Sequence, residues 1–259
     1  MPKLSIITVN YNDLNGLKKT VQSVHTQTSQ EFEHIIIDGG STDASVEYIK
    51  KHQDSFSYWV SEPDKGVYNA MNKGIEQASG EYLLFLNAGD HFINEQSLQR
   101  ALTHLSGEHI IYFNLHVVEG SRDFTKTYPS RLSFSYFVED TLPHPATFIK
   151  KTAFAKAGTY REDFKIVSDW KFFIDAICRY QLSYKKVSDT ITTFYIGGMS
   201  SDPKNYDLKN NERTEVLSKE YTAFYQDVND TLHMRKTLNS LKKSRIITLL
   251  VKLKFLNKF

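Results

Sequence analysis

Acidic and amide side chains follow three apolar segments of the chain, at the points where each segment would end as a β-strand. Asn10, Tyr11 and Asn12 follow the first, Asp38-Gly-Gly-Ser-Thr-Asp43 follows the second, and Asn87-Ala-Gly-Asp90 follows the third. In an open parallel sheet, ligands bind outside the carboxyl ends of the strands. Carboxylate and amide oxygens at that edge suit a nucleotide and a hard divalent cation. The same residues could instead only cap the following helices, so the pattern leaves both interpretations open.

The segments that precede these groups have the composition of buried parallel strands. Residues 4–10 (LSIITVN), 32–38 (FEHIIID) and 81–87 (EYLLFLN) are largely apolar runs. Helical patterns with capping residues follow the first two, and a short strand at 58–61 precedes a helix near 67–78. This alternation predicts right-handed crossovers and a parallel sheet.

The second half of the chain has a different pattern, with longer and partly exposed strands. We expect an α/β fold in which helices flank a mixed, mainly parallel sheet over residues 1–204, followed by a helical extension over 205–259. The elements expected in this half are strands at 109–119, 123–128, 146–150, 183–187 and 190–196, a helix at 169–180, and a polar helical stretch at roughly 205–227.

The composition limits the class of protein. The chain has 259 residues, 40% hydrophobic and 24% charged, which is ordinary for a soluble globular protein. Cys178 is the only cysteine, so no disulfide can form within one chain, and a reducing cytoplasm is expected. Residues 1–12 lack a signal-peptide pattern, and no run of about 18 apolar residues indicates a transmembrane helix. We find no phosphate-binding loop, dinucleotide glycine fingerprint, nucleophile turn or zinc-ligand spacing.

Charge is unevenly distributed, although the net charge is only +2. Residues 231–259 contain eight basic side chains and no acidic one, which leaves the first 230 residues with 24 basic and 30 acidic groups, a net charge of −6. Basic and apolar residues alternate here, a pattern that favours an anionic membrane surface. Packing on the domain or on a second subunit of a homodimer is an alternative, and the few aromatic residues disfavour nucleic acid. The basic residues are Arg235, Lys236, Lys242, Lys243, Arg245, Lys252, Lys254 and Lys258.

Six sequence segments occur in a characteristic order over about residues 3–200. They are SIITVNYN, IIIDGGSTD, SEPDKGVYNAMNKGIEQASGEYLLFLNAGD, LPHPATFIKK, FKIVSDWKFFIDA and FYIGGMSS. Together they resemble glycosyltransferase family 2, in the bacterial branch that builds surface polysaccharides. The resemblance implies a GT-A fold, a nucleoside-diphosphate sugar donor, a divalent cation (Mn²⁺ or Mg²⁺) and inversion at the anomeric carbon.

The resemblance also implies which residues contact the donor. Thr8, Asn10 and Tyr11 match the first strand end, which holds the nucleoside, and Asp38 matches the acid that hydrogen-bonds the base, usually uracil. An ionised carboxylate accepts the imide N–H of uracil well. Residues 62–73 match the stretch that lines the donor pocket. Its donor-binding candidates are Asp64, Lys65, Gly66, Asn72 and Lys73.

The segment LNAGD (86–90) occupies the family's metal motif, which is usually Asp-x-Asp. Here Asn87 stands at the first acid and Gly89 at the second, which leaves Asp90 as the metal-binding candidate. Asn87 and Ala88 then line the donor pocket. A hard divalent cation also takes oxygen ligands from a diphosphate and from water, so one carboxylate can suffice.

Asp169, in the Ser-Asp-Trp segment that opens a helix, matches the family's catalytic base. An N-cap is the alternative role, in which case Glu162 and Asp163 are the next candidates for the base. Glycines in the FYIGGMSS segment resemble a mobile loop that closes over the donor. The acceptor-side or pocket candidates are His144, Trp170, Gly197 and Gly198.

The function expected from these features is an inverting, metal-dependent transfer of a sugar from a UDP-sugar to an acceptor hydroxyl. A lipid-linked saccharide in surface polysaccharide synthesis is the expected acceptor, which would place the enzyme at the inner face of the cytoplasmic membrane. A nucleotidyltransferase is an alternative, although SIITVNYN lacks the basic loop that it would need. A non-catalytic sugar-nucleotide-binding protein is another, because the metal motif is reduced.

Overall fold

A computed structural model of the chain describes residues 2–253 and 255. The chain forms two compact units, Met1–Arg213 and Thr214–Phe259. The boundary lies within α8 (Tyr206–Glu220), whereas the sequence interpretation separates residues 1–204 from 205–259. The second unit is helical and contains α9 (Thr222–Lys243) and α10 (Arg245–Lys252).

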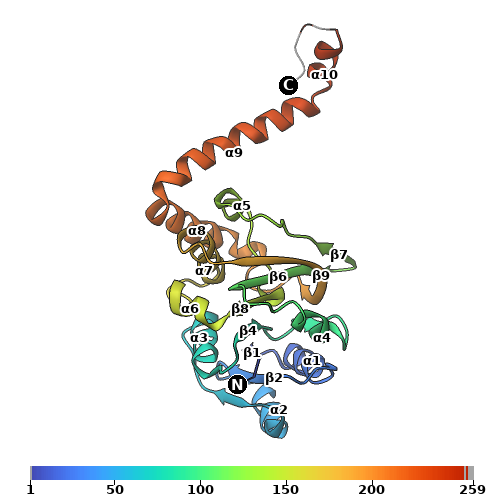
Figure 1. The fold of residues 1–259 in the computed structure, drawn as a ribbon, viewed down its shortest axis with the longest axis vertical. Helices are drawn as coiled ribbons and strands as arrows, with labels where there is room; N and C mark the ends of the chain where they lie inside the picture. The colour runs from blue at the N-terminus through green and yellow to red at the C-terminus, as the bar shows by residue number, and fades with distance from the viewer. Residues whose placement is uncertain (1, 254, 256–259) are drawn as a thin grey trace. The chain divides into compact units, whose positions relative to one another are not determined.

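Nine strands within the described residues form one sheet, in the order β3-β2-β1-β4-β8-β6-β9-β5, with β7 paired to β6 (Figure 1). Strands β1 to β4 are parallel, β8 runs antiparallel between β4 and β6, and β9 is parallel to β6. The expected α/β fold with a mixed, mainly parallel sheet is therefore confirmed. The strands are β1 (Leu4–Asn10), β2 (Phe32–Asp38), β3 (Tyr58–Ser61), β4 (Tyr82–Phe85), β5 (His91–Phe92), β6 (Ile110–Glu119), β7 (Arg122–Lys126), β8 (Thr147–Lys150) and β9 (Tyr184–Tyr195).

Helices cover both faces of the sheet, with α3 and α6 on one side and α1 and α4 on the other (Figure 1). On α1, the buried residues Leu17, Val21 and Val24 recur every three or four positions, which is the spacing of one helix face. Burial stabilises the fold by about 1.5–3 kcal/mol for each such side chain. The helices of the first unit are α1 (Leu14–His25), α2 (Ser45–Lys51), α3 (Val67–Gln77), α4 (Ser97–Leu102), α5 (Phe134–Glu139), α6 (Lys151–Ala157) and α7 (Ser168–Ile174), which continues as a π-helix (Asp175–Arg179).

The register of the parallel strands brings their polar ends together. Asn10 at the end of β1 pairs with Asp38 at the end of β2, and Asp38 pairs with Ser61 at the end of β3. Beyond β4, the N–H of Ala88 donates to the carbonyl of Val9 at 2.9 Å, so residues 87–90 leave the sheet beside β1. All three polar strand ends therefore lie at one edge of the sheet.

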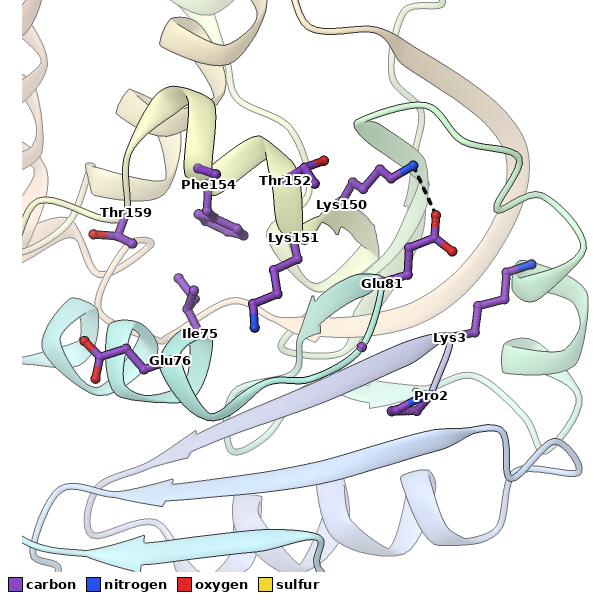
Figure 2. Close-up of a pocket in the computed structure, with 12 residues that line it drawn as sticks. Pro2, Lys3, Ile75, Glu76, Glu81, Lys150, Lys151, Thr152, Phe154 and Thr159 are labelled. Carbon is purple, nitrogen blue, oxygen red and sulfur yellow. Dashed lines mark ion pairs between the residues drawn. The ribbon is translucent and has the colours of Figure 1, made fainter.

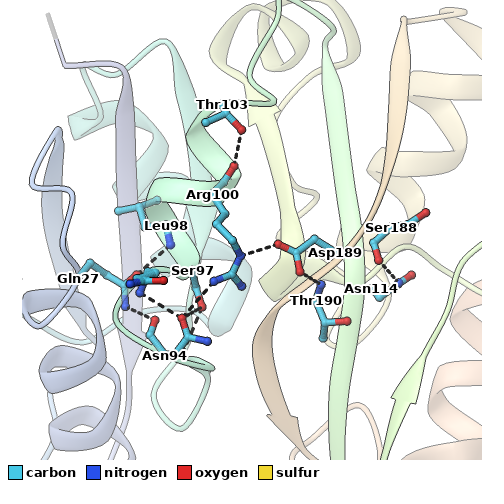
Figure 3. A network of polar contacts seen from close by, with 11 residues as sticks. Gln27, Asn94, Ser97, Leu98, Arg100, Thr103, Asn114, Ser188, Asp189 and Thr190 are labelled. Atoms are coloured by element: carbon cyan, nitrogen blue, oxygen red, sulfur yellow. Dashed lines mark hydrogen bonds and ion pairs between the residues drawn. The ribbon is translucent and has the colours of Figure 1, made fainter.

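Strand β9 differs from the sequence prediction. The two strands expected near 183–187 and 190–196 are one strand, so that prediction is wrong. The pairing of β9 with β6 shifts register around Asn114, whose amide donates to the Ser188 carbonyl at 2.9 Å. Next to the bulge, Arg100 on α4 binds Asp189 at 2.8 Å, which ties the strand to the helix layer (Figure 3). Polar residues at the bulge interrupt the apolar pattern, which is why the sequence predicted two strands. The strand continues through these residues.

Three short helices, α4, α5 and α6, were absent from the sequence prediction. Each has only six or seven residues, which is about two turns and too short for a clear helical period. Strand β5 has two residues and was also missed. The long strands and helices of the first 90 residues were predicted because their apolar pattern extends over several turns or pleats.

A cavity of about 960 Å³ lies at the opposite edge of the sheet from the polar strand ends. Pro2 and Lys3 precede β1 there, and Glu81 precedes β4 and pairs with Lys150 at 3.1 Å (Figure 2). Its lining combines apolar side chains, such as Ile75 and Phe154, with charged ones, such as Lys151. Its position at the amino ends of the parallel strands is not where ligands bind in open α/β sheets.

Candidate active site

A cavity of about 470 Å³ lies at the carboxyl edge of the sheet. The first turn of α3 contributes Val67 and Tyr68, and the loop after β9 contributes residues 197–200. Residues 87–90 after β4 form another wall, and Asp169 at the start of α7 forms a third. The cavity thus brings together residues that are more than 100 positions apart in the sequence. The residues of the predicted site that line it include Asn87, Ala88, Asp90, Asp169, Gly197 and Gly198.

A second cavity, of about 420 Å³, adjoins the first. Asp169, His144 and Phe194 line both cavities. The second cavity extends toward β7 and α8 and is also lined by Trp170. Asp169 therefore stands where two chambers meet, and a group in either chamber can reach its carboxylate.

The Asp169 side chain is held by its neighbours at the start of α7. The Tyr68 Oη lies 2.8 Å from Asp169 Oδ1 and 2.7 Å from the carbonyl oxygen of Ile166. Burial, reinforced by the nearby Asp169 charge, raises the pKa of Tyr68 well above its usual value, so the phenol stays protonated. The next residue, Trp170, is buried and donates its indole N–H to the Phe137 carbonyl at 2.8 Å, which anchors the helix.

Asp90 is buried, and among the described residues its carboxylate has no cation beside it and no side-chain donor, only the backbone N–H of Asn87. Burial raises its pKa to about 8, because the charged form loses its hydration. The Oδ1 atom of Asn87, which lines the same cavity, is also buried and has no hydrogen-bond partner within the described part of the chain. A buried carboxylate with one donor and a buried amide oxygen with none are unfavourable in a protein interior unless a ligand satisfies them.

These oxygens fit the divalent cation that the family implies. Hard cations prefer carboxylate and amide oxygens and accept further oxygens from diphosphate and water. In residues 2–253 and 255, no group of three or more His, Cys, Asp or Glu side chains is placed to hold a metal ion. A cation here would therefore depend on the donor for most of its ligands.

Asp38 is completely buried and is saturated by donors from its own chain. Its Oδ1 accepts from the Asn10 amide at 2.7 Å and from the Ser41 hydroxyl at 2.6 Å. Its Oδ2 accepts from the Ser41 N–H at 2.9 Å and from the Ser61 hydroxyl at 2.7 Å. The structure thus gives Asp38 the role of fixing the turn after β2. Its contact with a base stays a prediction.

The exposed surface beside this turn is shaped by Tyr11, Gly39 and Asp64. Tyr11 is 65% exposed, and a Cβ added to Gly39 would lie 3.3 Å from its ring and 2.4 Å from Asp64 Oδ2. Gly39 is therefore needed for this close approach. The Asp64 carboxylate accepts the N–H of Gly66, which has a φ of 124° that favours glycine.

Of the eleven predicted donor-binding residues, only Asn87 and Ala88 line either cavity. Four of the other nine have partners elsewhere in the fold. Thr8 is buried and shares a hydrogen bond with His34 at 3.0 Å. Asn72 binds the backbone of Tyr160 through both its amide nitrogen and its oxygen. Lys73 pairs with Glu62 at 2.7 Å, and the Lys65 N–H binds the Asn69 side chain. Their roles in donor binding stay predictions.

His144 forms part of an aromatic wall between the cavities. Its ring stacks on Phe85 at a centroid distance of 4.8 Å, and its Nε2 lies 2.9 Å from the hydroxyl of Tyr160. Burial lowers the pKa of His144, so the imidazole is neutral at pH 7. A neutral ring of this kind can shape a sugar-binding wall but does not supply a positive charge.

The loop after β9 closes one side of the first cavity. Gly197 has a φ of 133°, which favours glycine, and its N–H donates to the Ser201 hydroxyl at 2.9 Å. The carbonyl of Gly198 accepts the N–H groups of Ser201 and Asp202. The loop is therefore a compact turn, and its predicted closure over a donor remains untested.

Several cavity residues were not predicted from the sequence. They are Asp13, Tyr68, Lys126, Lys165, Lys209 and Arg213. Asp13 was interpreted only as a helix cap, and it does accept the Gly16 N–H at 2.9 Å. Tyr68 lies in a quoted family segment, but nothing in its local pattern shows that it faces a residue 101 positions away.

The comparisons with known proteins agree with this geometry. The family model described as Glycosyl transferase family 2 matches residues 5–163. The chain belongs to glycosyltransferase family 2. A protein of Mycobacterium tuberculosis named as an uncharacterized glycosyltransferase is 38% identical to this glycosyltransferase over 180 residues, which are 68% of this chain and 69% of that protein. A PGL/p-HBAD biosynthesis glycosyltransferase of Mycobacterium bovis is 28% identical over 208 residues, 77% of this chain and 80% of that protein.

Solved structures show that the glycosyltransferase has a GT-A type fold. S. aureus TarS 1-349 in complex with UDP-GlcNAc has a TM-score of 0.65 at 18% identity, covering 83% of this chain and 66% of that one, just under two thirds. The mannosyltransferase PcManGT from Pyrobaculum calidifontis, in complex with GDP-Man and Mn²⁺, has a TM-score of 0.58 at 14% identity, covering 98% and 79%. At these identities the likeness concerns the fold alone.

Proposed function

We propose that this glycosyltransferase transfers one sugar from a UDP-sugar to an acceptor hydroxyl with inversion at the anomeric carbon. The observation that carries the proposal is the position of Asp169 where the two cavities meet. The donor would occupy the cavity that contains Asn87 and Asp90, and the acceptor would enter through the other. An acceptor hydroxyl beside Asp169 could then attack the anomeric carbon from the side opposite the leaving diphosphate.

Asp169 and Tyr68 together can take and hold the proton of the acceptor hydroxyl. Before reaction, the Tyr68 proton can point at Asp169 Oδ1, which leaves Oδ2 to accept the proton from the acceptor. The Tyr68 hydroxyl can instead donate to the Ile166 carbonyl, which is also within reach. Once Oδ2 carries the proton, Oδ1 can still accept from the Tyr68 hydroxyl, so the product state keeps this hydrogen bond.

A divalent cation at Asp90 and Asn87 would stabilise the negative charge that gathers on the departing diphosphate. Support for the cation comes from the partnerless Asn87 oxygen, from the buried Asp90 carboxylate with its single backbone donor, and from the Mn²⁺ in the PcManGT complex. Support for a uridine donor comes from the TarS complexes with UDP and UDP-GlcNAc. The contact of Asp38 with the base is part of the same proposal.

The second unit is proposed to bind the cytoplasmic face of an anionic membrane, where a lipid-linked saccharide acceptor would lie. On α10, Ile246 and Leu249 are exposed and three residues apart, and Leu253 follows four residues later. Lys242, Lys243 and Lys252 supply positive charge along the same segment, while Lys254 and Lys258 of the predicted tail lie outside the described residues. Exposed apolar residues combined with basic ones fit the interface of an anionic bilayer.

No helix in the described part of the chain is both long enough and apolar enough to cross a bilayer. Truncation after residue 230 should abolish binding to anionic vesicles. Retained binding by the truncated protein would remove the membrane proposal and favour packing on another subunit.

A donor panel tests the proposed reaction. The purified full chain is incubated with UDP-, GDP- and dTDP-sugars, and free nucleotide diphosphate and pyrophosphate are measured separately. Release of UDP supports the glycosyl transfer, whereas pyrophosphate release would indicate a nucleotidyltransferase. Binding of a UDP-sugar without any turnover, across a panel of saccharide acceptors, would favour a non-catalytic binding protein.

A further inference from the structure

The second cavity has a charged end beside Asp169. Lys126 on β7 and Lys209 and Arg213 on α8 line it, together with the acidic residues Glu139 and Asp140. Lys126 is neutralised because its ammonium pairs with Asp140 at 2.8 Å. The two basic groups of α8 have no such direct partner among the described residues, and they face the chamber one helical turn apart.

Lys209 is the least compensated of these charges. Its ammonium donates to the carbonyl of Ser200 at 3.2 Å, and no carboxylate within the described residues lies at ion-pair distance from it. The pKa of Lys209 is lowered, first by partial burial and then by the charge of Arg213, while the charges of Asp169 and Asp140 act in the opposite direction. Burial disfavours the cation, and a bound anion would offset that cost.

Arg213 is fixed in orientation at the same end of the chamber. One terminal nitrogen, Nη2, donates to the carbonyls of Phe137 and Asp140, and the guanidinium lies 4.6 Å from the centre of the Trp170 ring. These contacts hold the planar group without neutralising it. A guanidinium held in this way is suited to binding an oxyanion through more than one N–H.

Apart from its charged end, the chamber is lined by apolar and aromatic side chains. Leu115, Val117 and Phe124 line the wall formed by β6 and β7. His144 and Trp170 provide rings on the side of Asp169. An occupant that combines a sugar ring, an apolar portion and an oxyanion would therefore match the chamber in each of its parts.

We propose that the acceptor carries a phosphate group close to the hydroxyl that accepts the sugar, and that Lys209 and Arg213 bind this phosphate. This inference rests on the proposed function, since it assigns the second cavity to the acceptor. A phosphate is favoured because its charge of up to −2 can pair with both cations, neither of which has a carboxylate in direct contact among the described residues, whereas a neutral sugar would leave both without a direct anionic partner. Binding the phosphate would also place the accepting hydroxyl beside Asp169.

The experiment uses the full chain saturated with UDP, so that the donor cavity is filled before the probe is added. Binding of glucose 6-phosphate, glucose and glucuronate is measured by titration calorimetry. The expected order is glucose 6-phosphate first, with glucuronate weaker and glucose without measurable binding. In Lys209→Gln, the affinity for glucose 6-phosphate should fall at least about tenfold. In Lys209→Arg, which keeps the charge, most of the affinity should return.

Lys204→Gln is the matched control, because Lys204 is an exposed lysine five residues away that lines neither cavity. It should bind glucose 6-phosphate as the wild type does. An unchanged affinity for UDP in Lys209→Gln shows that the fold and the donor site are intact. Unchanged glucose 6-phosphate affinity in Lys209→Gln, or tighter binding of glucuronate or glucose than of the phosphate, would overturn the proposal.

The phosphate proposal and the proposed function fail in different ways. If the wild type binds UDP but no phosphate probe, the phosphate site is wrong while the glycosyltransferase proposal stands. If it binds neither UDP nor a UDP-sugar, the proposed function itself fails.

Discussion

The turn after β2 and the turn after β4 each place a buried aspartate at the same edge of the sheet, but they treat it in opposite ways. Four donors from the chain saturate Asp38. Asp90 has only the backbone N–H of Asn87 as a donor among the described residues, and burial raises its pKa to about 8. A carboxylate whose lone pairs are filled holds structure, whereas one with few internal donors at a cavity is available to a ligand.

Asp169 resembles Asp90 in this respect, because Tyr68 supplies a single hydrogen bond to one of its oxygens. One oxygen is therefore positioned and the other is available for proton transfer. The two carboxylates with few internal donors, Asp169 and Asp90, are the ones with a direct part in the proposed chemistry. Substitutions at these two positions are therefore expected to affect activity more than substitution of Asp38.

The largest effect is expected for Asp169→Asn. The N-cap of α7 is Val167 and Asp169 makes no side-chain cap hydrogen bond, so the N-cap role suggested by the sequence is not observed. The amide keeps a similar shape and can still accept from the Tyr68 hydroxyl, so the fold should remain nearly as stable. It cannot accept the acceptor proton, so turnover should fall by about 10²–10⁴-fold while the Kd for UDP stays close to that of the wild type. Nucleotide release and calorimetry measure the two quantities. Near-wild-type turnover would show that Asp169 is not the base.

In that case, Glu162 and Asp163 become the next candidates for the base. The structure already gives each of them another partner, since Glu162 accepts from Asn69 and Asn72 and Asp163 pairs with Arg161.

Tyr68→Phe sharpens the test of Asp169. Losing the phenol should lower kcat with a smaller change in UDP affinity, because Tyr68 contacts Asp169 directly.

The next effect is expected for Asp90→Ala and for removal of the cation. Charge stabilisation by a metal ion contributes several kcal/mol to such a transition state, so activity should fall by about 10²-fold or more. EDTA should produce the same loss in the wild type, and added Mn²⁺ or Mg²⁺ should restore it. The variant should gain nothing from added metal. Full wild-type activity in EDTA would show that the Asp90 carboxylate does not hold a catalytic cation.

A smaller and different effect is expected for Asp38→Ala. Four donors would lose their acceptor in a buried turn, so the free energy of unfolding should fall by about 1–3 kcal/mol. UDP binding should also weaken if Asp38 contacts the base. Ser61→Ala is the control, because it removes one of the four donors and should leave the Kd for UDP unchanged. A folded Asp38→Ala protein with normal UDP affinity would end the base assignment.

The sequence predicted the polar edge but not the difference between its two aspartates. The runs 4–10, 32–38 and 81–87 are long enough for their apolar pattern to define strands, and strands define which residues reach the carboxyl edge. Saturation of Asp38 depends on Asn10, Ser41 and Ser61, which the parallel register brings together. A single sequence contains no signal for that register.

The site residues that escaped prediction share a physical cause. Lys209 and Arg213 lie on α8, whose surface is polar all round, so the pattern does not show which face meets the cavity. Thr8 was assigned to the donor because it lies near a strand end, but the alternation of side chains along β1 turns it toward His34 inside the protein. Asp169 was found because its segment resembles a family motif.

The smallest effect is expected from a change of pH. It concerns the stability of β2, the strand that ends in Asp38. His34 lies on β2, four residues before Asp38, and its pKa is lowered to about 3 by burial and, to a smaller extent, by the neighbouring His25. In the unfolded chain its pKa is near 6.5, so between pH 6.5 and 3 the unfolded state binds more protons than the folded state. Stability is therefore complete above pH 6.5 and is lost as the pH falls.

At pH 5 this difference amounts to about 2 kcal/mol from His34. His34→Gln keeps a polar partner for Thr8 and removes the titrating group, so its unfolding free energy should change less between pH 7 and pH 5. His233→Gln, at an exposed position of the second unit, should retain the full wild-type change. Chemical denaturation at the two pH values measures it. If His34→Gln and the wild type lose the same unfolding free energy between pH 7 and pH 5, His34 is not the group that makes the protein sensitive to acid.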